Sequence, residues 1–278
     1  MTTSAFAERV EQSLPVLLKG LFTPPTPDDA WSATGVRERI GGKLLTVEVS
    51  ASGEFYGGKQ RDGSDVTRME MTCGEFLDRM AGAGNHAPIL APSERYYAHS
   101  APIEAYAPLD AELPIPALID QPRYGTVQRQ VFISARGHTT PVHTDAWIDN
   151  LLAQIVGRKT VLMWSPDQAE SLAIMPFGDV WARQSPLDPS DPERFPASAH
   201  ALRAVLEAGD ALYIPEGWIH HVTTDELSIG VSHKFNQQTA FEDALKIVAG
   251  RIMTIRPELR AQYLHLFRWP AAMLSGPM

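Results

Sequence analysis

The sequence predicts a mainly β protein with flanking helices, whose centre is a double-stranded β-helix, or jelly-roll, barrel. Short β-branched or alternating runs separated by turn signals recur at 127–134, 151–157, 159–164, 210–215 and 226–235, as in antiparallel barrels. The chain of 278 residues is 44% hydrophobic and 21% charged, which is typical of a globular protein with one large core. We therefore expect a barrel with an N-terminal α/β extension and C-terminal helices.

The first part, 1–90, is predicted to be a helix and strand extension packed on the barrel. Ser4 is a candidate cap for a helix that ends at Pro15, and PVLLKGL then reads as a strand. A helix over 30–40 and a strand over 44–50 follow. Thr72 and Glu75 fit a capping box ahead of a third helix.

The second part, 91–236, is the predicted catalytic core. RYYAHS at 95–100 is expected to be its first strand. The Pro-rich 102–124 is expected to be irregular and to face the substrate, since long irregular segments in compact proteins often cover binding sites. A polar insertion is predicted between 165 and 208. In the last part, 237–278, a capping box at Thr239 and Glu242 predicts helices that pack on the barrel or pair two subunits into a homodimer.

Charge and cysteine content exclude several classes of function. The net charge of −9 argues against binding of a nucleic-acid backbone, which needs clustered Lys and Arg. A single cysteine, Cys73, excludes an intrachain disulfide and a multi-thiolate metal site. No run approaches 18 apolar residues, and the N-terminus lacks the apolar core of a signal peptide. We expect a cytoplasmic protein without membrane contact.

One His-x-Asp pair, His143 and Asp145, stands in a segment that reads as extended. Residues two apart in a strand point to the same face, so this imidazole and this carboxylate can converge on one ion. A third ligand is available in GDALYIPEGWIHHV, which contains His220 and His221. Adjacent strand residues face opposite sides, so only one of the two histidines can join the pair. Two histidines and one carboxylate with open positions suit non-haem Fe(II) oxygen chemistry.

The segments 138–163 and 208–222 resemble the Jumonji-C, or cupin-like, family of Fe(II)/2-oxoglutarate oxygenases. The similarity covers about residues 90 to 236 and is nearest to the type of the hypoxia-inducible-factor asparaginyl hydroxylase. This resemblance implies a cupin barrel that uses Fe(II), 2-oxoglutarate and O2. It selects His220 over His221 as the ligand, and His221 is then expected to point outward or to support the site.

The resemblance also assigns roles. It implies that His143, Asp145 and His220 bind the catalytic iron, and that Lys159 and Thr140 hold the distal carboxylate of 2-oxoglutarate. Further candidates near the cosubstrate are Asn150, Tyr97 and Ser232. Ser228, Gly230 and Ser232 alternate with apolar residues, so one face of their strand is predicted to be small and to leave room for a ligand. Trp147 and His233 are expected to be structural.

The predicted reaction is hydroxylation of a C–H bond in a protein or peptide side chain. Hydroxylation of a small metabolite or natural-product intermediate is the alternative among oxygenases. N-methyl-lysine demethylation is disfavoured because no reader or zinc module accompanies the barrel. From other classes, a non-enzymatic metal-binding cupin and a Zn(II) hydrolase or isomerase remain open. Lys159 speaks against a plain binding barrel, which has no need of a cation opposite the metal.

Overall fold

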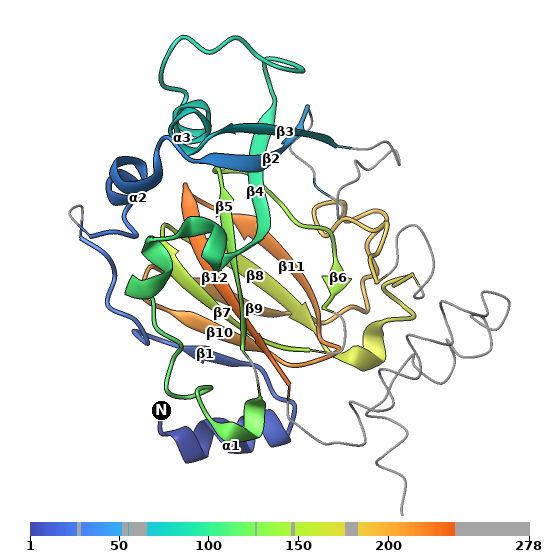
Figure 1. The fold of residues 1–278 in the computed structure, drawn as a ribbon. Helices are drawn as coiled ribbons and strands as arrows, with labels where there is room; N and C mark the ends of the chain where they lie inside the picture. Colours follow the sequence, from blue (N-terminus) through green and yellow to red (C-terminus); the bar gives the residue numbers. More distant parts are fainter. Residues whose placement is uncertain are drawn as a thin grey trace, which may run out of the picture.

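Two antiparallel sheets face each other in the computed structural model, which describes residues 1–26, 29–51, 55, 66–125, 127–145, 148–175 and 183–236. The larger sheet has the order β1-β10-β7-β12-β5-β4-β2-β3 and the smaller one the order β6-β11-β8-β9 (Figure 1). The larger sheet comprises β1 (Val16–Leu18), β2 (Leu44–Ser50), β3 (Thr67–Thr72), β4 (Arg95–Pro102), β5 (Gln128–Ser134), β7 (Asp149–Val156), β10 (Ala211–Ile214) and β12 (Ser228–Phe235). The smaller sheet comprises β6 (His143–Thr144), β8 (Lys159–Trp164), β9 (Leu202–Leu206) and β11 (Ile219–Thr224).

Strand β12 shows how the sequence sorts residues between the two faces of the larger sheet. Its apolar residues Ile229 and Val231 are fully buried in the main hydrophobic cluster. Gly230, between them, faces the smaller sheet, because a Cβ built on it would lie 3.5 Å from the Nζ of Lys159 in β8. The predicted alternation of an apolar face and a small-residue face is therefore present. The small-residue face lines the barrel interior.

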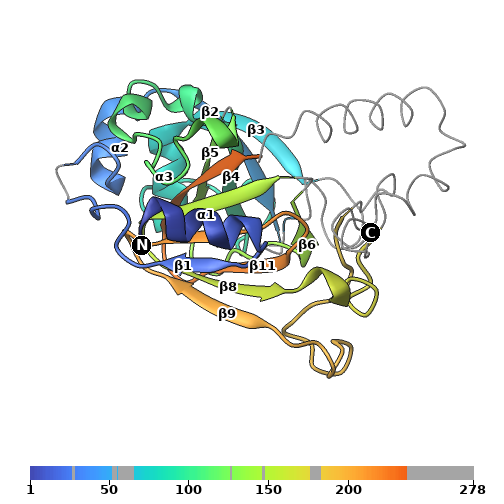
Figure 2. The same ribbon diagram turned by 90° about the horizontal axis from the view of Figure 1, so that it is seen from below.

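The outer face of the larger sheet is covered by helices and by the 102–124 segment. Helices α2 (Ala33–Ile40) and α3 (Cys73–Ala81) lie beside β2 and β3 (Figure 1), and α1 (Thr3–Glu11) lies along β1 (Figure 2). Short 3-10 helices at Ile103–Tyr106, Leu109–Glu112 and Pro122–Tyr124 bury apolar side chains, and a further one is Pro166–Gln168. The indole Nε1 of Trp31 donates to the carbonyl of Leu109 over 2.8 Å.

The expectation that 102–124 faces the substrate is therefore wrong. Ile103, Tyr106 and Leu109 are fully buried against the outward residues of β5 and β12, on the side of the sheet opposite the barrel interior. Long, proline-rich irregular segments often form binding loops. In this fold the prolines break the segment into short turns that each insert apolar side chains into the core.

Of the two helix caps predicted for the N-terminal part, the structure confirms one and corrects the other. The first helix is capped by Thr2, whose hydroxyl accepts from the N–H of Ala5, rather than by Ser4. Thr72 caps α3 as predicted, since its hydroxyl accepts from the N–H of Glu75 over 3.2 Å. The Glu75 carboxylate accepts instead from Arg79, one helical turn later.

Two strands lie where no strand was predicted. β3 extends the larger sheet beyond β2, and β9 lies inside the polar insertion predicted for 165–208. β1 of the N-terminal extension pairs with β10 of the barrel, so the extension is hydrogen-bonded to the core. The predicted helices of 237–278 lie outside the described residues. Among the helices that the structure describes, none has the length and apolar character to cross a membrane.

Candidate metal centre

His143, Asp145 and His220 converge at one end of the barrel interior. His143 lies in β6 directly opposite His220 in the neighbouring strand β11, and their ring centroids are 4.2 Å apart. Asp145 follows β6, two residues after His143. One possible ligand atom from each of the three side chains lies within 4.8 Å of the others. These three residues have the composition and the proximity that a divalent cation requires.

Both histidines are oriented through their Nδ1 atoms. The Nδ1 of His143 bonds the carbonyl of Pro141 over 2.8 Å, and the Nδ1 of His220 bonds that of Trp218 over 3.2 Å. Because a carbonyl only accepts, each Nδ1 carries the proton and each Nε2 keeps a free lone pair. Proteins commonly orient metal-binding imidazoles in this way.

Asp145 is held on both of its oxygens. The side-chain N–H of Asn150 in β7 donates to Oδ2 over 3.0 Å, and the ammonium of Lys234 in β12 lies 3.3 Å from Oδ1. Asn150 is fixed in turn by the hydroxyl of Ser232, which donates to its Oδ1 over 2.5 Å. The larger sheet therefore fixes a carboxylate that belongs to the loop after β6.

Burial and mutual charge set the protonation of the cluster. Burial, reinforced by the neighbouring His220, lowers the pKa of His143 to about 3. Burial alone would raise the pKa of Asp145, but His220, Lys234 and His143 outweigh it and hold that pKa below its ordinary value. At neutral pH His143 is therefore a neutral imidazole and Asp145 a carboxylate, the forms that bind metal ions.

Lys159 lies deeper in the same barrel. It pairs with Thr224 in β11, four residues along that strand from His220, which corresponds to roughly 13 Å. Its side chain is buried, and burial lowers its pKa to about 8. Among the described residues, its ammonium has no hydrogen-bond or ion-pair partner. A buried cation without a partner is costly, so an anionic ligand would be stabilised at this position.

A cradle for such a ligand lies beside the Lys159 ammonium. A Cβ built on Gly230 would lie 3.5 Å from the Lys159 Nζ and 3.7 Å from the Oε1 of Gln154, so glycine keeps this space open. The Gln154 amide is fixed because its Nε2 donates to the carbonyl of Val156 and to the hydroxyl of Ser228. Its Oε1 is buried and has no hydrogen-bond partner within the described part of the chain.

The remaining predicted residues have distinct positions. The Thr140 hydroxyl accepts from the N–H of Val222 over 2.9 Å, which leaves its own proton free to donate to a ligand. Tyr97 in β4 is buried, and its ring centroid lies 4.0 Å from that of His138. His221 faces away from the cluster, as strand alternation predicts, and its Nε2 contacts the Thr223 hydroxyl.

His233 is fully buried among apolar residues on the outer face of β12, in keeping with the expected structural role. Trp147 lies outside the described residues. The sequence analysis missed Gln154, Lys234 and Arg183. The first two could have been found from strand alternation, since Gln154 shares a face with Asn150 and Lys234 shares one with Ser232.

The residues present fit a ferrous ion and a dicarboxylate. Two Nε2 atoms and one carboxylate form the facial set typical of non-haem Fe(II). The ammonium of Lys159 and the orphaned Oε1 of Gln154 mark a polar space deeper in the barrel. A dicarboxylate that binds the ion with one end would carry a second negative charge, for which the Lys159 ammonium is a counter-charge in the same barrel.

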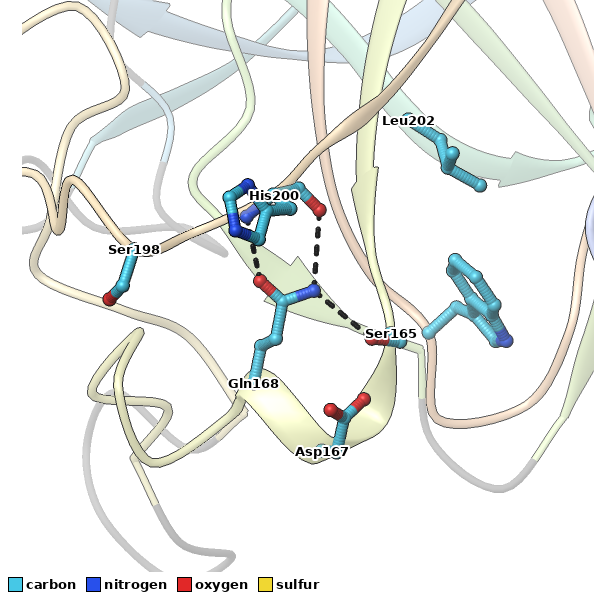
Figure 3. Close-up of a pocket in the computed structure, with 7 residues that line it drawn as sticks. Ser165, Asp167, Gln168, Ser198, His200 and Leu202 are labelled. Carbon is cyan, nitrogen blue, oxygen red and sulfur yellow. Dashed lines mark hydrogen bonds between the residues drawn. The ribbon is translucent and has the colours of Figure 1, made fainter.

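A separate surface pocket lies outside the barrel interior (Figure 3). Its cavity volume is about 490 Å³, and Ser165, Asp167, Gln168, Ser198, His200, Leu202 and Trp218 line it. The Gln168 amide donates to the Ser165 hydroxyl and accepts from the N–H of His200 over 2.9 Å. The bond to His200 joins the segment after β8 to the segment before β9. None of the predicted site residues lines this pocket.

Comparison with known proteins agrees with the geometry. The cupin-like domain family matches residues 2–241. The chain is 28% identical to tRNA wybutosine-synthesizing protein 5 of Gallus gallus over 235 residues. The aligned region covers 78% of this chain and 69% of that protein. The chain is 38% identical to lysine-specific demethylase JMJ31 of Arabidopsis thaliana over 89 residues, which are 30% of this chain and 16% of that protein. It is 34% identical to 2-oxoglutarate and iron-dependent oxygenase JMJD4 of Gallus gallus over 112 residues, which are 38% of this chain and 26% of that protein. The asparaginyl hydroxylase type stays a prediction.

Proposed function

Since this chain belongs to the cupin-like domain family, we propose that it is an Fe(II)- and 2-oxoglutarate-dependent oxygenase that hydroxylates a C–H bond. The observation that carries the proposal is the placement of a buried ammonium, which has no partner among the described residues, in the same barrel as a His-Asp-His cluster. The JMJD4 relative is named for the same two cofactors. A metal-binding barrel without 2-oxoglutarate has no use for that ammonium.

In the proposed enzyme, His143, Asp145 and His220 hold the iron, and Lys159 with Thr140 holds the distal carboxylate of 2-oxoglutarate. Bound iron, 2-oxoglutarate and O2 together supply the oxidant that hydroxylates the substrate. Asn150 keeps the Asp145 carboxylate in position.

For the substrate we propose a protein or peptide side chain, with a small metabolite as the second candidate. The relatives named above include a lysine-specific demethylase and a tRNA-modifying protein. The net charge of −9 disfavours tRNA as a partner, because this charge repels a phosphate backbone. Purified tRNA belongs in the substrate screen as a test of this argument.

The proposed function is tested by 2-oxoglutarate decarboxylation with Fe(II), ascorbate and O2. We expect the wild-type chain to form succinate, His143→Ala to form none, and His200→Ala, a change in the separate surface pocket, to retain full turnover. Mass spectrometry of peptides, amino-acid metabolites and tRNA would then identify the substrate by the gain of one oxygen atom. Turnover by His143→Ala equal to that of wild type would refute the proposal.

Two rivals give different results in binding experiments. A non-enzymatic cupin would bind Fe(II) but would form no succinate. A Zn(II) hydrolase or isomerase would show no visible charge-transfer band when Fe(II) and 2-oxoglutarate are added without oxygen. We expect this band in the wild-type chain and its loss in Lys159→Met at 2-oxoglutarate concentrations that saturate the wild type.

A further inference from the structure

We infer that the substrate of this oxygenase presents an oxyanion, as a carboxylate or a phosphate carries, to Lys234 and Arg183 beside the metal cluster. This inference rests on the proposed function and specifies the chemical class of its substrate. It comes from cations that neither iron nor 2-oxoglutarate would neutralise.

Lys234 stands at the opposite end of the interior face of β12 from the cosubstrate cradle. Gly230 of that face lies against Lys159, and Lys234 lies four residues further, or roughly 13 Å along the strand. The ammonium of Lys234 contacts Asp145 instead. The two lysines therefore lie at opposite ends of this face, and Lys234 is the one that contacts a residue of the metal cluster.

Arg183 lies on the other flank of the cluster. Its backbone carbonyl accepts from the N–H of Thr144, and the N–H of Ser185 donates to the carbonyl of Val142, so this segment runs beside β6. The Arg183 Nε is buried and has no hydrogen-bond partner among the described residues. Asp145 acts electrostatically on this guanidinium.

Among the residues that the structure describes, the charges around the cluster do not balance without a further anion. Asp145 forms an ion pair with Lys234 and also acts electrostatically on the Arg183 guanidinium. No other carboxylate in the described part of the chain does both. If Asp145 binds a ferrous ion, it is shared between that ion and both cations. Asp145 and the metal-bound carboxylate of 2-oxoglutarate together offset the two charges of the ion, and the distal carboxylate offsets Lys159, so Lys234 and Arg183 remain in excess among the described residues. Partly buried cations in this state stabilise an incoming oxyanion, and the guanidinium matches one with two parallel donors.

A single anionic group fits this site better than a polyanion. The chain carries a net charge of −9, which repels an extended phosphate backbone at long range. The attraction is local to two side chains. It would set the position of one carboxylate or phosphate close to the C–H bond that reacts.

The test measures ligand binding by proton relaxation, with the full chain loaded with Mn(II) and 2-oxoglutarate under nitrogen. Mn(II) speeds the relaxation of protons near it. The probes are N-acetyl-aspartate N-methylamide, its neutral asparagine counterpart, the O-phosphoserine analogue and the cationic lysine analogue. We expect the acidic probes to bind about tenfold more tightly than the asparagine probe, as one charge-assisted contact predicts.

Variants assign the preference to the two cations. Lys234→Gln/Arg183→Gln should abolish it, Lys234→Arg should retain it, and Arg158→Gln, which changes an exposed arginine paired with Asp225, should leave it unchanged. If the double variant fails to fold, the single Arg183→Gln variant serves, with an expected partial loss. The aspartate and phosphoserine arms show which oxyanion is preferred.

The outcomes separate this inference from the proposed function. Equal binding of acidic and neutral probes, or a preference that survives in the variants, would overturn the inference while 2-oxoglutarate protons still show relaxation by Mn(II). Absence of relaxation of the 2-oxoglutarate protons in the wild-type chain would remove the proposed function, and the inference with it.

Discussion

Asn150 donates its side-chain N–H to the Oδ2 of Asp145 over 3.0 Å, and so joins the larger sheet to a metal-ligand candidate on the loop after β6. From the sequence, Asn150 was predicted to lie near the cosubstrate. Its hydrogen bond indicates a role in orienting the carboxylate. Ser232 fixes the same amide from the neighbouring strand β12.

Removal of this amide should weaken metal binding. We expect Asn150→Ala to lower the affinity for Mn(II) by about 10- to 100-fold, the usual effect of losing a group that orients a ligand. Calorimetric titration measures it. Asn85→Ala, which changes an exposed asparagine, is the control and should bind as the wild type does. Unchanged affinity in Asn150→Ala would show that Asp145 is held in position without Asn150.

Lys159 should contribute to 2-oxoglutarate binding and not to metal binding. We expect Lys159→Met to weaken 2-oxoglutarate binding by roughly 100-fold, because a buried charged contact is lost, while Mn(II) affinity is retained. Lys43→Met, at a partly exposed lysine whose ammonium bonds the carbonyl of Ala107, should change neither. Titration of 2-oxoglutarate into the Mn(II)-loaded protein decides the matter. If both variants bound 2-oxoglutarate with the same affinity, Lys159 would have no specific role in binding it.

The pH dependence of 2-oxoglutarate binding should follow the same ammonium. Burial lowers the pKa of Lys159 to about 8, and only the protonated form attracts a dicarboxylate. Affinity should therefore be full below pH 8 and should fall as the pH rises above it. In Lys159→Arg the fall should disappear, since a guanidinium stays charged throughout this range. Affinities measured between pH 7 and 10 test both statements.

The space beside Gly230 should be needed for binding of 2-oxoglutarate and not for binding of the metal. An added Cβ would make ordinary van der Waals contacts at 3.5 Å from the Lys159 Nζ, so Gly230→Ala should fold and retain some binding. Gly230→Val adds methyl groups that enter the cradle, and it should lose 2-oxoglutarate binding while it keeps Mn(II). Retention of wild-type 2-oxoglutarate affinity by Gly230→Val would place the cosubstrate elsewhere.

His233 should make folding sensitive to acid. Burial lowers its pKa from 6.5 to about 4, so between these values the unfolded chain binds a proton that the folded chain does not. Its contribution is therefore full above pH 6.5 and is lost as the pH falls towards 4, by roughly 3 kcal/mol in total. Denaturant unfolding of the metal-free chain should show a shallower pH slope in His233→Leu. His200→Leu, at an exposed histidine, should keep the wild-type slope.

The barrel and the pairing of His143 with Asp145 could be predicted from the sequence. Both follow from short-range patterns: β-branched runs between turns predict strands, and the spacing of His143 and Asp145 places two ligands on one face. Strand alternation also put His221 on the face opposite His220, as observed. The buried lysine was accessible to sequence analysis only through a family resemblance.

The residues that surround the ligands come from distant parts of the chain and are brought together by the packing of the strands. Lys234 contacts Asp145 because β12 lies near the end of β6, and the 183–185 segment runs beside β6, an arrangement that no local pattern in the sequence specifies. Strands β3 and β9 exist for the same reason, since their hydrogen bonds depend on neighbours from elsewhere in the chain. Propensity and periodicity describe a residue and its near neighbours, whereas register and charge balance arise from long-range packing.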